Sequence, residues 1–284
     1  RVEDGESVAL VAGPVPHEGG EFGQVGERHT GLAQFDRVFE PLHIDGREAP
    51  AAARRRGAPS SPKPEWLAQN VSVVPLDLAD LANVRATSEH LRASEPRLDL
   101  LVAAAGVMAS PERRVGPGWE SQFAINHLGH FALVNLLLPL LTNADGARVV
   151  SYSSAGHHFS DIRWDDLHFA NGYDKWLAYG QSKTANALFA SHLDSIAQDR
   201  GIPAFSLHPG SIFTELQRDV SAAKGIALGW TDVEGNVIAP CLKSVSQGAA
   251  TGLWAATESA LDDHGGVYCE NCDIAPLADP DGAS

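Results

Sequence analysis

The chain has 284 residues, of which 36 are acidic and 21 are Lys or Arg, so its formal net charge at pH 7 is -15. This negative charge argues against nucleic acid and against an anionic membrane surface as partners, because both carry the same sign of charge. Hydrophobic residues make up 44% of the chain, enough for a full core, and the length suits one large domain over residues 1–284.

The first predicted strand is residues 7–13, which ends at Gly13. A Gly-rich turn after such a strand is typical of a dinucleotide site, because its backbone N–H groups face the pyrophosphate. Here Pro14 and Pro16 enter the turn, and proline has no N–H to donate. The segment 49–64 then resembles a linker in its low complexity.

Residues 1–70 are therefore interpreted as a divergent or disrupted cofactor-binding part, and residues 71–276 as the clear core of the domain. Two hypotheses explain the first part: a reading-frame disruption between about Gly13 and Trp66, or a genuinely divergent cofactor half. In a dinucleotide site, a residue at the end of the strand after the Gly-rich turn chooses between NAD and NADP. The sequence does not locate that strand here, and the nearby candidates are Asp45, which would favour NAD, and Arg47, which would favour NADP.

Strands and helices alternate through the rest of the chain. Short apolar runs predict strands at 71–77, 98–106, 148–154 and 202–210, and longer apolar or amphipathic segments predict helices at 81–91, 121–134, 179–193 and 246–256. This alternation predicts an α/β fold with a doubly wound, Rossmann-like parallel sheet. Ligands bind such sheets at the carboxyl ends of the strands.

Three other segments carry weaker signals. Residues 164–176 are predicted to be a polar insertion, and residues 214–245 a substrate-side lobe. In that lobe Leu228 and Trp230 either line an apolar pocket or simply pack. The longest apolar run, 131–141, is shorter than the roughly 18 residues of a membrane span, so we expect a buried helix, no membrane anchor, no signal peptide and a cytoplasmic protein.

Tyr179 and Lys183 are the most informative pair in the chain. Their spacing of four residues places them on one face of a helix. An ammonium near a phenol favours the phenolate, so the pair predicts a Tyr179 pKa below the usual value of about 10 and a role in proton transfer. The spacing is common by chance, so its weight depends on the motifs around it.

Those surrounding motifs identify the chain, from about Leu76 to Pro276, as resembling the short-chain dehydrogenase/reductase family. It is most similar to the branch of retinol-dehydrogenase-like enzymes and actinobacterial oxidoreductases. The matching motifs, in family order and spacing, are Leu76–Leu78, Val102–Gly106, Asn126–Phe131, Val150–Ser154, Tyr179–Lys183, His208–Thr214 and Gly265–Cys272.

The resemblance implies a set of catalytic roles. Tyr179 matches the acid/base, and Lys183 matches the residue that lowers its pKa and binds the nicotinamide ribose. Ser154 matches the residue that holds the substrate oxygen, with Ser153 as the weaker choice. Asn126 matches the residue that anchors a water relay to the Lys.

The same resemblance implies the cofactor contacts, with NADP preferred over NAD. Asp77 matches the carboxylate near the adenine. Ala104 and Gly106 lie in the turn where relatives carry Asn-Asn-Ala-Gly, and here Ala103 and Ala104 replace both Asn. The remaining contacts implied by the resemblance are Gly13, Asn126, Tyr179, Lys183, Pro209, Gly210, Ile212 and Thr214.

Cys241, Cys269 and Cys272 are the cysteines of the chain, and the last two have C-x-x-C spacing. With no second pair and no nearby His to complete a zinc set, two reduced thiols are expected. We expect no metal site among the 12 His residues either.

The sequence thus predicts an NAD(P)-dependent oxidoreductase that interconverts an alcohol and a ketone or aldehyde, with Tyr179 as general acid/base assisted by Lys183 and Ser154. The expected partner is a small, lipophilic carbonyl or alcohol substrate, and family analogy implies a homodimer or homotetramer. The alternative is a catalytically silent scaffold or ligand-binding protein that has lost dinucleotide binding.

Overall fold

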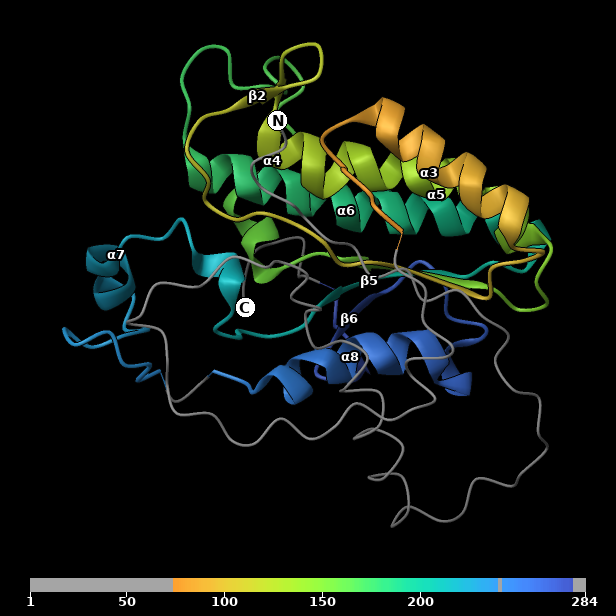
Figure 1. Cartoon of the computed structure of the whole chain (residues 1–284). Coiled ribbons are helices and arrows are strands. Elements are labelled where there is room, and N and C mark those ends of the chain that lie inside the picture. The colour runs from red at the N-terminus through yellow and green to blue at the C-terminus, as the bar shows by residue number, and fades with distance from the viewer. Residues whose placement is uncertain (1–73, 240–241, 278–284) are drawn as a thin grey trace.

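The computed structural model describes residues 74–239 and 242–277 (Figure 1). The predictions on Gly13, on the segment 13–66 with Asp45 and Arg47, and on Cys241 lie outside these residues.

A five-stranded sheet forms the centre of the described domain, in the order β1-β4-β5-β6-β7. The first four strands pair in parallel, and only β7 runs antiparallel to its neighbour. This arrangement confirms the predicted α/β class. The strands are β1 (Leu100–Ala103), β4 (Arg148–Tyr152), β5 (Ala204–His208), β6 (Tyr268–Glu270) and β7 (Asp273–Ile274).

Helices cover both faces of this sheet. Figure 1 shows α3, α5 and α6 together on one face and α8 on the other. The helices are α3 (Leu81–Ser94), α4 (Ser121–Phe123), a π-helical stretch (Ala124–Leu128), α5 (Gly129–Thr142), α6 (Lys175–Ala197), α7 (Ala222–Ala227) and α8 (Val245–Thr257). A small hairpin pairs β2 (Arg114–Val115) with β3 (Trp119–Glu120), and single 3₁₀ turns occupy Ala155–Phe159, Gln198–Arg200, Glu215–Gln217 and Ser259–Leu261.

The alternation of side chains along the strands divides the core into two layers. Val149 in β4 packs in the layer under α3, α5 and α6, and the adjacent Val150 packs with Phe205 and Leu207 in the layer over α8. Successive side chains of a strand point to opposite faces, so a parallel strand buried on both sides is mostly apolar. Val149 and Val150 meet this condition, and the buried polar residues Arg148 and Ser151 donate hydrogen bonds to the Ala255 and Asn186 carbonyls.

The predicted strand at 71–77 is not found over its described part, residues 74–77. Pro75 has no N–H for a strand ladder, and its carbonyl accepts a hydrogen bond from Thr87 Oγ1 at 2.9 Å instead. The Asp77 N–H donates to Asn83 Oδ1 at 2.7 Å. Side chains of α3 thus take the backbone groups that a neighbouring strand would need.

The apolar helix is longer than the sequence suggested. The run Ser121–Thr142 has 22 residues and contains an 18-residue window with a mean hydropathy of 1.5, so by length and composition it could cross a membrane. More than half of its apolar window, 56%, is buried inside the domain, as in the core helix of a soluble protein. The expectation of a buried helix agrees with this placement, whereas the expectation that no apolar helix reaches a spanning length was wrong.

We predict that His130, which is only 3% exposed, makes the domain less stable in acid. Burial lowers the pKa of His130 from 6.5 to about 4, so the folded state binds fewer protons than the unfolded state between these values. The free energy of unfolding should therefore fall as pH drops from 6.5 to 4, by about 3 kcal/mol from this residue.

Urea unfolding across this pH range checks the prediction. His130→Gln, which cannot titrate, should show a shallower pH dependence than the wild type, while the exposed control His90→Gln should not. Equal slopes in all three proteins would contradict it.

Candidate active site

Tyr179 and Lys183 lie on one face of α6 beneath the carboxyl ends of the strands, as predicted. Both are buried, with exposures of 3% and 6%. Lys183 Nζ lies 5.7 Å from the centroid of the Tyr179 ring and donates to the Tyr152 carbonyl at 3.0 Å. The end of β4 therefore fixes the ammonium beside the phenol.

Ser154 follows β4 directly and caps the 3₁₀ turn Ala155–Phe159. Its Oγ accepts a hydrogen bond from the Gly156 N–H at 3.0 Å, which leaves its own proton free to be donated. A Cβ on Gly156 would come within 2.6 Å of Tyr179 Cε1, so this position must be glycine for the phenol to approach. Ser153 is turned away and donates to the Lys183 carbonyl at 2.8 Å, which agrees with its being the weaker candidate.

The predicted lowering of the Tyr179 pKa is not found in the structure. Burial raises the pKa of Tyr179, and hydrogen bonding with Ser154 opposes this only in part. Burial also lowers the pKa of Lys183 to about 8. Both shifts have one cause, since a site removed from water disfavours the charged form of every group in it. The sequence argument counted the attraction between the charges and omitted their loss of hydration.

Asn126 lies in the π-helical stretch, and its side chain is completely buried. Oδ1 accepts from the Val107 N–H at 2.8 Å, and Nδ2 donates to the Val107 carbonyl and to Ser182 Oγ, both at 2.9 Å. A Cβ on Gly106 would lie 2.9 Å from Asn126 Oδ1. The amide thus fastens the turn after β1 to the helix that carries Lys183.

The loop after β5 brings Pro209, Gly210, Ile212 and Thr214 to the same sheet edge. Gly210 has a φ of +94°, and a Cβ there would collide with Lys243. Lys243 Nζ donates to the Pro209 carbonyl at 3.2 Å and to Asn271 Oδ1 at 2.8 Å. Thr214 caps the next turn, since its Oγ1 accepts from the Leu216 N–H at 3.2 Å.

Two further predicted cofactor residues lie at the edge of the described domain. Ala104 is exposed just after β1. Asp77 is half-buried, and one carboxylate oxygen accepts from the Ala79 N–H at 2.8 Å, which leaves the other oxygen available.

An apolar wall stands beside the Tyr179 ring. Residues from the turn after β1, from the first turn of α6 and from the lobe after β5 pack with it, namely Met108, Ala109, Trp176, Leu216, Val220 and Trp230. Both readings of Trp230, lining an apolar pocket or simply packing, are compatible with this cluster, whereas Leu228 is 41% exposed and is not part of it.

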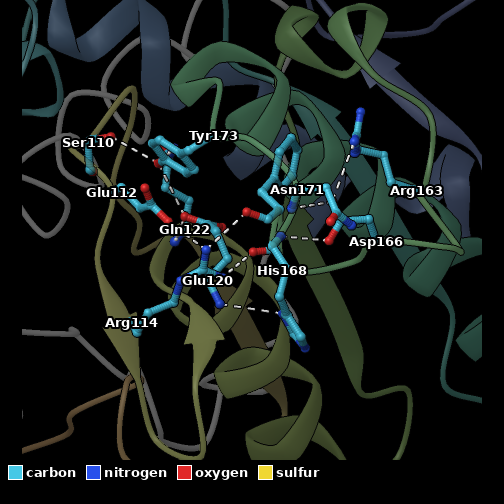
Figure 2. Close-up of polar contacts among 12 residues, drawn as sticks. Ser110, Glu112, Arg114, Glu120, Gln122, Arg163, Asp166, His168, Asn171 and Tyr173 are labelled. Atoms are coloured by element: carbon cyan, nitrogen blue, oxygen red, sulfur yellow. Dashed lines mark hydrogen bonds and ion pairs between the residues drawn. The ribbon is translucent and has the colours of Figure 1, made fainter.

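The insertion before α6 is anchored to this wall rather than free in solvent (Figure 2). The Tyr173 hydroxyl donates to the Ser110 carbonyl at 2.9 Å and also lies 3.3 Å from Glu120 Oε1. Glu120 is fully buried, caps α4 by accepting from two backbone N–H groups, and has a pKa raised by burial. The insertion also buries Phe169, so its description as a polar segment was incomplete.

Cys269 and Cys272 are free, as expected. Burial raises the pKa of Cys269 to about 12, so this thiol stays protonated. Within residues 74–239 and 242–277, no group of three or more His, Cys, Asp or Glu side chains is placed to hold a metal ion.

The sequence analysis missed several residues of the site. Trp176 precedes Tyr179 by one helical turn, so the helical spacing was a usable signal for it. Met108 and Lys243 carry no such signal, because their positions depend on how loops meet in three dimensions.

Known proteins resemble this chain in sequence and in fold. A family model described as "short chain dehydrogenase" matches residues 51–225. A probable oxidoreductase of Streptomyces lividans is 41% identical over 236 residues, which cover 81% of this chain and 78% of the relative. The chain belongs to the short-chain dehydrogenase family. This is a family of oxidoreductase enzymes that use a nicotinamide cofactor.

Within the short-chain dehydrogenases, the chain also resembles the retinol dehydrogenases. Retinol dehydrogenase 12 of Mus musculus is 39% identical over 202 residues, or 71% of this chain. The match spans 61% of the length of that mouse protein.

Solved structures show the same fold. An uncharacterized protein from Mycobacterium paratuberculosis matches with a TM-score of 0.52 and 34% identity over 72% of this chain and 65% of its own. The NADPH-bound carbonyl reductase from chicken fatty liver matches with a TM-score of 0.53 at 19% identity, over 75% and 81% of the two chains.

The raised pKa values of the tyrosines can be tested by measuring tyrosinate absorbance as a function of pH. All four tyrosines of the chain have a pKa raised by burial, Tyr152 and Tyr268 to about 12. We therefore expect less tyrosinate absorbance at pH 10 in the protein without cofactor than in free tyrosine at the same pH. A step well below pH 10 that disappears in Tyr179→Phe, and persists in the control Tyr152→Phe, would contradict the burial argument.

Proposed function

We propose that this short-chain dehydrogenase reduces lipophilic aldehydes or ketones, and oxidises the matching alcohols, with NADP(H). The observation that carries the proposal is the convergence of Ser154, Tyr179 and Lys183 beside one apolar wall. Proton donors and a buried cation suit a carbonyl oxygen that gains negative charge, and the wall suits the rest of the molecule.

The residues at the sheet edge fit a nicotinamide cofactor. Lys183 Nζ uses one acceptor, the Tyr152 carbonyl, and has two further hydrogens for ribose hydroxyls. Gly106 and Ala104 keep the end of β1 free of large side chains, as close approach of a cofactor requires. Pro209, Gly210, Ile212 and Thr214 would flank the nicotinamide, which supplies or accepts the hydride when bound. NADP is preferred on the resemblance to the retinol-dehydrogenase branch, and the chicken carbonyl reductase of the same fold is NADPH-bound.

In the direction of reduction, Ser154 and Tyr179 donate hydrogen bonds to the carbonyl oxygen of the substrate. The bond from the Gly156 N–H holds Ser154 Oγ in place beside Tyr179 and does not use the hydroxyl proton. Tyr179 then transfers its proton to the oxygen that has gained negative charge. Its raised pKa keeps the phenol protonated at neutral pH, which is the form that reduction needs. Lys183 favours the resulting phenolate.

The apolar wall supports a lipophilic substrate. Met108, Trp176 and Trp230 reach the Tyr179 ring from three separate segments, and aromatic side chains present large apolar surfaces to a ligand. The relatedness to retinol dehydrogenase 12 makes all-trans-retinal a suitable first substrate.

We also propose that two copies pair through α5 and α6. Phe131 on α5 and Leu188 on α6 are 46% and 54% exposed, and such large apolar side chains on adjacent helices favour burial against a partner.

Trp230 tests the substrate class. We expect Trp230→Ala to raise the KM for all-trans-retinal roughly 10-fold, because a large apolar contact worth about 1.5 kcal/mol or more is removed. The KM for propanal, which is too short to reach the wall, should change much less. Trp164→Ala, at a residue that is 77% exposed and outside the wall, is the matched control. A similar change for both aldehydes would count against the proposed substrate.

Tyr179 tests the chemistry. Titration of the protein with NADPH and with NADH, followed by nicotinamide fluorescence, should show tighter binding of NADPH. Tyr179→Phe should retain this binding and lose at least about 100-fold in kcat for retinal reduction, because the proton donor is removed. Absence of NADPH binding by the folded wild-type protein would instead favour the silent-scaffold alternative, and substantial turnover by Tyr179→Phe would refute the role of the phenol.

A further inference from the structure

His157 lies three residues after Ser154 and contacts the backbone that carries it. Its ring Nδ1 lies 2.7 Å from the Ser154 carbonyl oxygen, and its backbone N–H donates to the same oxygen at 3.0 Å. One residue therefore holds this carbonyl twice, once through the turn and once through its side chain. A carbonyl oxygen can only accept, so Nδ1 must carry a proton.

The ring of His157 is held in turn by β6. The Tyr268 hydroxyl lies 3.3 Å from His157 Nδ1, and the centroids of the two rings are 5.1 Å apart. The Tyr268 hydroxyl also hydrogen-bonds with Ser153, the residue before Ser154. Because β6 pairs with β5 and β5 pairs with β4, Tyr268 connects the turn at the end of β4 to a strand two places away in the sheet.

These contacts matter because the Ser154 carbonyl lies beyond the hydrogen-bond ladder of the sheet. The Ser153 N–H donates to the Leu207 carbonyl at 2.9 Å, and this is the last ladder bond of β4. Beyond it, the peptide of Ser154 is oriented by the 3₁₀ turn and by the His157 ring. A rotation of that peptide would carry Ser154 Oγ away from Tyr179, and an error of about 1 Å in a catalytic group can cost on the order of 100-fold in rate.

We propose that His157, supported by Tyr268, is a positioning residue that aims the Ser154 hydroxyl at the substrate oxygen. The inference rests on the proposed reduction of a carbonyl by Ser154 and Tyr179. It assigns a function to His157, one of the 12 His residues among which the sequence analysis expected no metal site.

Three substitutions distinguish the hydrogen bond donated by His157 Nδ1 from the packing of the His157 ring. His157→Phe keeps an aromatic ring and removes the donor, whereas His157→Asn places an amide N–H near the position of Nδ1. Tyr268→Phe removes only the hydroxyl. The matched control is His158→Phe. The centroid of the His158 ring lies 3.9 Å from that of His157, but His158 is exposed and belongs to neither the catalytic nor the cofactor residues.

The first measurement is steady-state reduction of all-trans-retinal with NADPH. We expect His157→Phe to lower kcat by roughly 10- to 100-fold with KM changed by less than about 3-fold, since the wall and the cofactor contacts remain. His157→Asn should recover most of the loss, and Tyr268→Phe should show a smaller decrease. NADPH affinity and thermal midpoint should match the wild type in every variant that is compared. A His157→Phe enzyme with wild-type kcat, or an equal loss in His158→Phe, would overturn the proposal.

The second measurement does not depend on turnover. In ¹⁵N-histidine-labelled protein, NMR should show His157 as the Nδ1–H tautomer, and its Nδ1 resonance should shift in Tyr268→Phe. The Nε2–H tautomer at His157 would overturn the proposal even if the enzyme is active. Conversely, the Nδ1–H tautomer in a protein that does not reduce retinal would mean that the proposed substrate or function fails while the geometry around Ser154 stands.

Discussion

The buried amide of Asn126 is the contact on which the geometry of the site depends. It accepts from the N–H of Val107, donates to the carbonyl of the same residue, and donates to Ser182 Oγ. Each of these groups is shut off from water, and an unpaired buried N–H or carbonyl costs about 1–3 kcal/mol, so the amide cannot be replaced by an apolar side chain of similar size without loss. Val107 leads into the wall at Met108, and Ser182 adjoins Lys183. One side chain therefore sets the distance between the surface that contacts the substrate and the helix that performs the chemistry.

Burial holds the catalytic side chains in position at this site, but it also disfavours their charged forms. The buried setting holds Tyr179 and Lys183 in single positions, and by removing water it raises the pKa of the phenol and lowers that of the ammonium. For reduction this suits the proton donor, because a phenol that stays neutral can donate. Burial also raises the free-energy cost of charging Lys183. Lys183 can therefore stabilise a Tyr179 phenolate only while acceptors such as the Tyr152 carbonyl favour its ammonium form. The helical spacing of the pair predicts their proximity, but the sign of the pKa shift depends on how much of the surrounding chain excludes water.

This difference explains which parts of the molecule could be predicted from the sequence. Short apolar runs and helical spacing are local properties, and they placed β4, β5, α6 and α8 within a few residues of their observed bounds. The prediction of a strand around Pro75 was wrong because the backbone groups there hydrogen-bond to the side chains of Thr87 and Asn83. Strand propensity does not encode such tertiary contacts. The prediction of a polar insertion before α6 was incomplete for a similar reason, because the mostly polar composition of this segment does not show that Phe169 is buried. The roles of Ser154, Tyr179 and Lys183 came from family resemblance, and the structure adds that the three residues converge.

The division between scaffold and loops suggests how such a site can keep one reaction and change its substrate. Ser154, Tyr179 and Lys183 are fixed by β4, by α6 and by backbone hydrogen bonds within the core. Apart from Trp176 in α6, the apolar wall comes from the segments after β1 and after β5, and a side chain from elsewhere in the chain anchors each of these segments. Tyr173 holds the Ser110 carbonyl, and Lys243 holds the Pro209 carbonyl. Because these anchors bond to backbone carbonyls, they do not restrict the side chains of the wall. Met108, Leu216 or Trp230 can therefore change while the hydrogen bonds that hold Ser154 and Lys183 stay intact, which separates the choice of substrate from the chemistry performed on it.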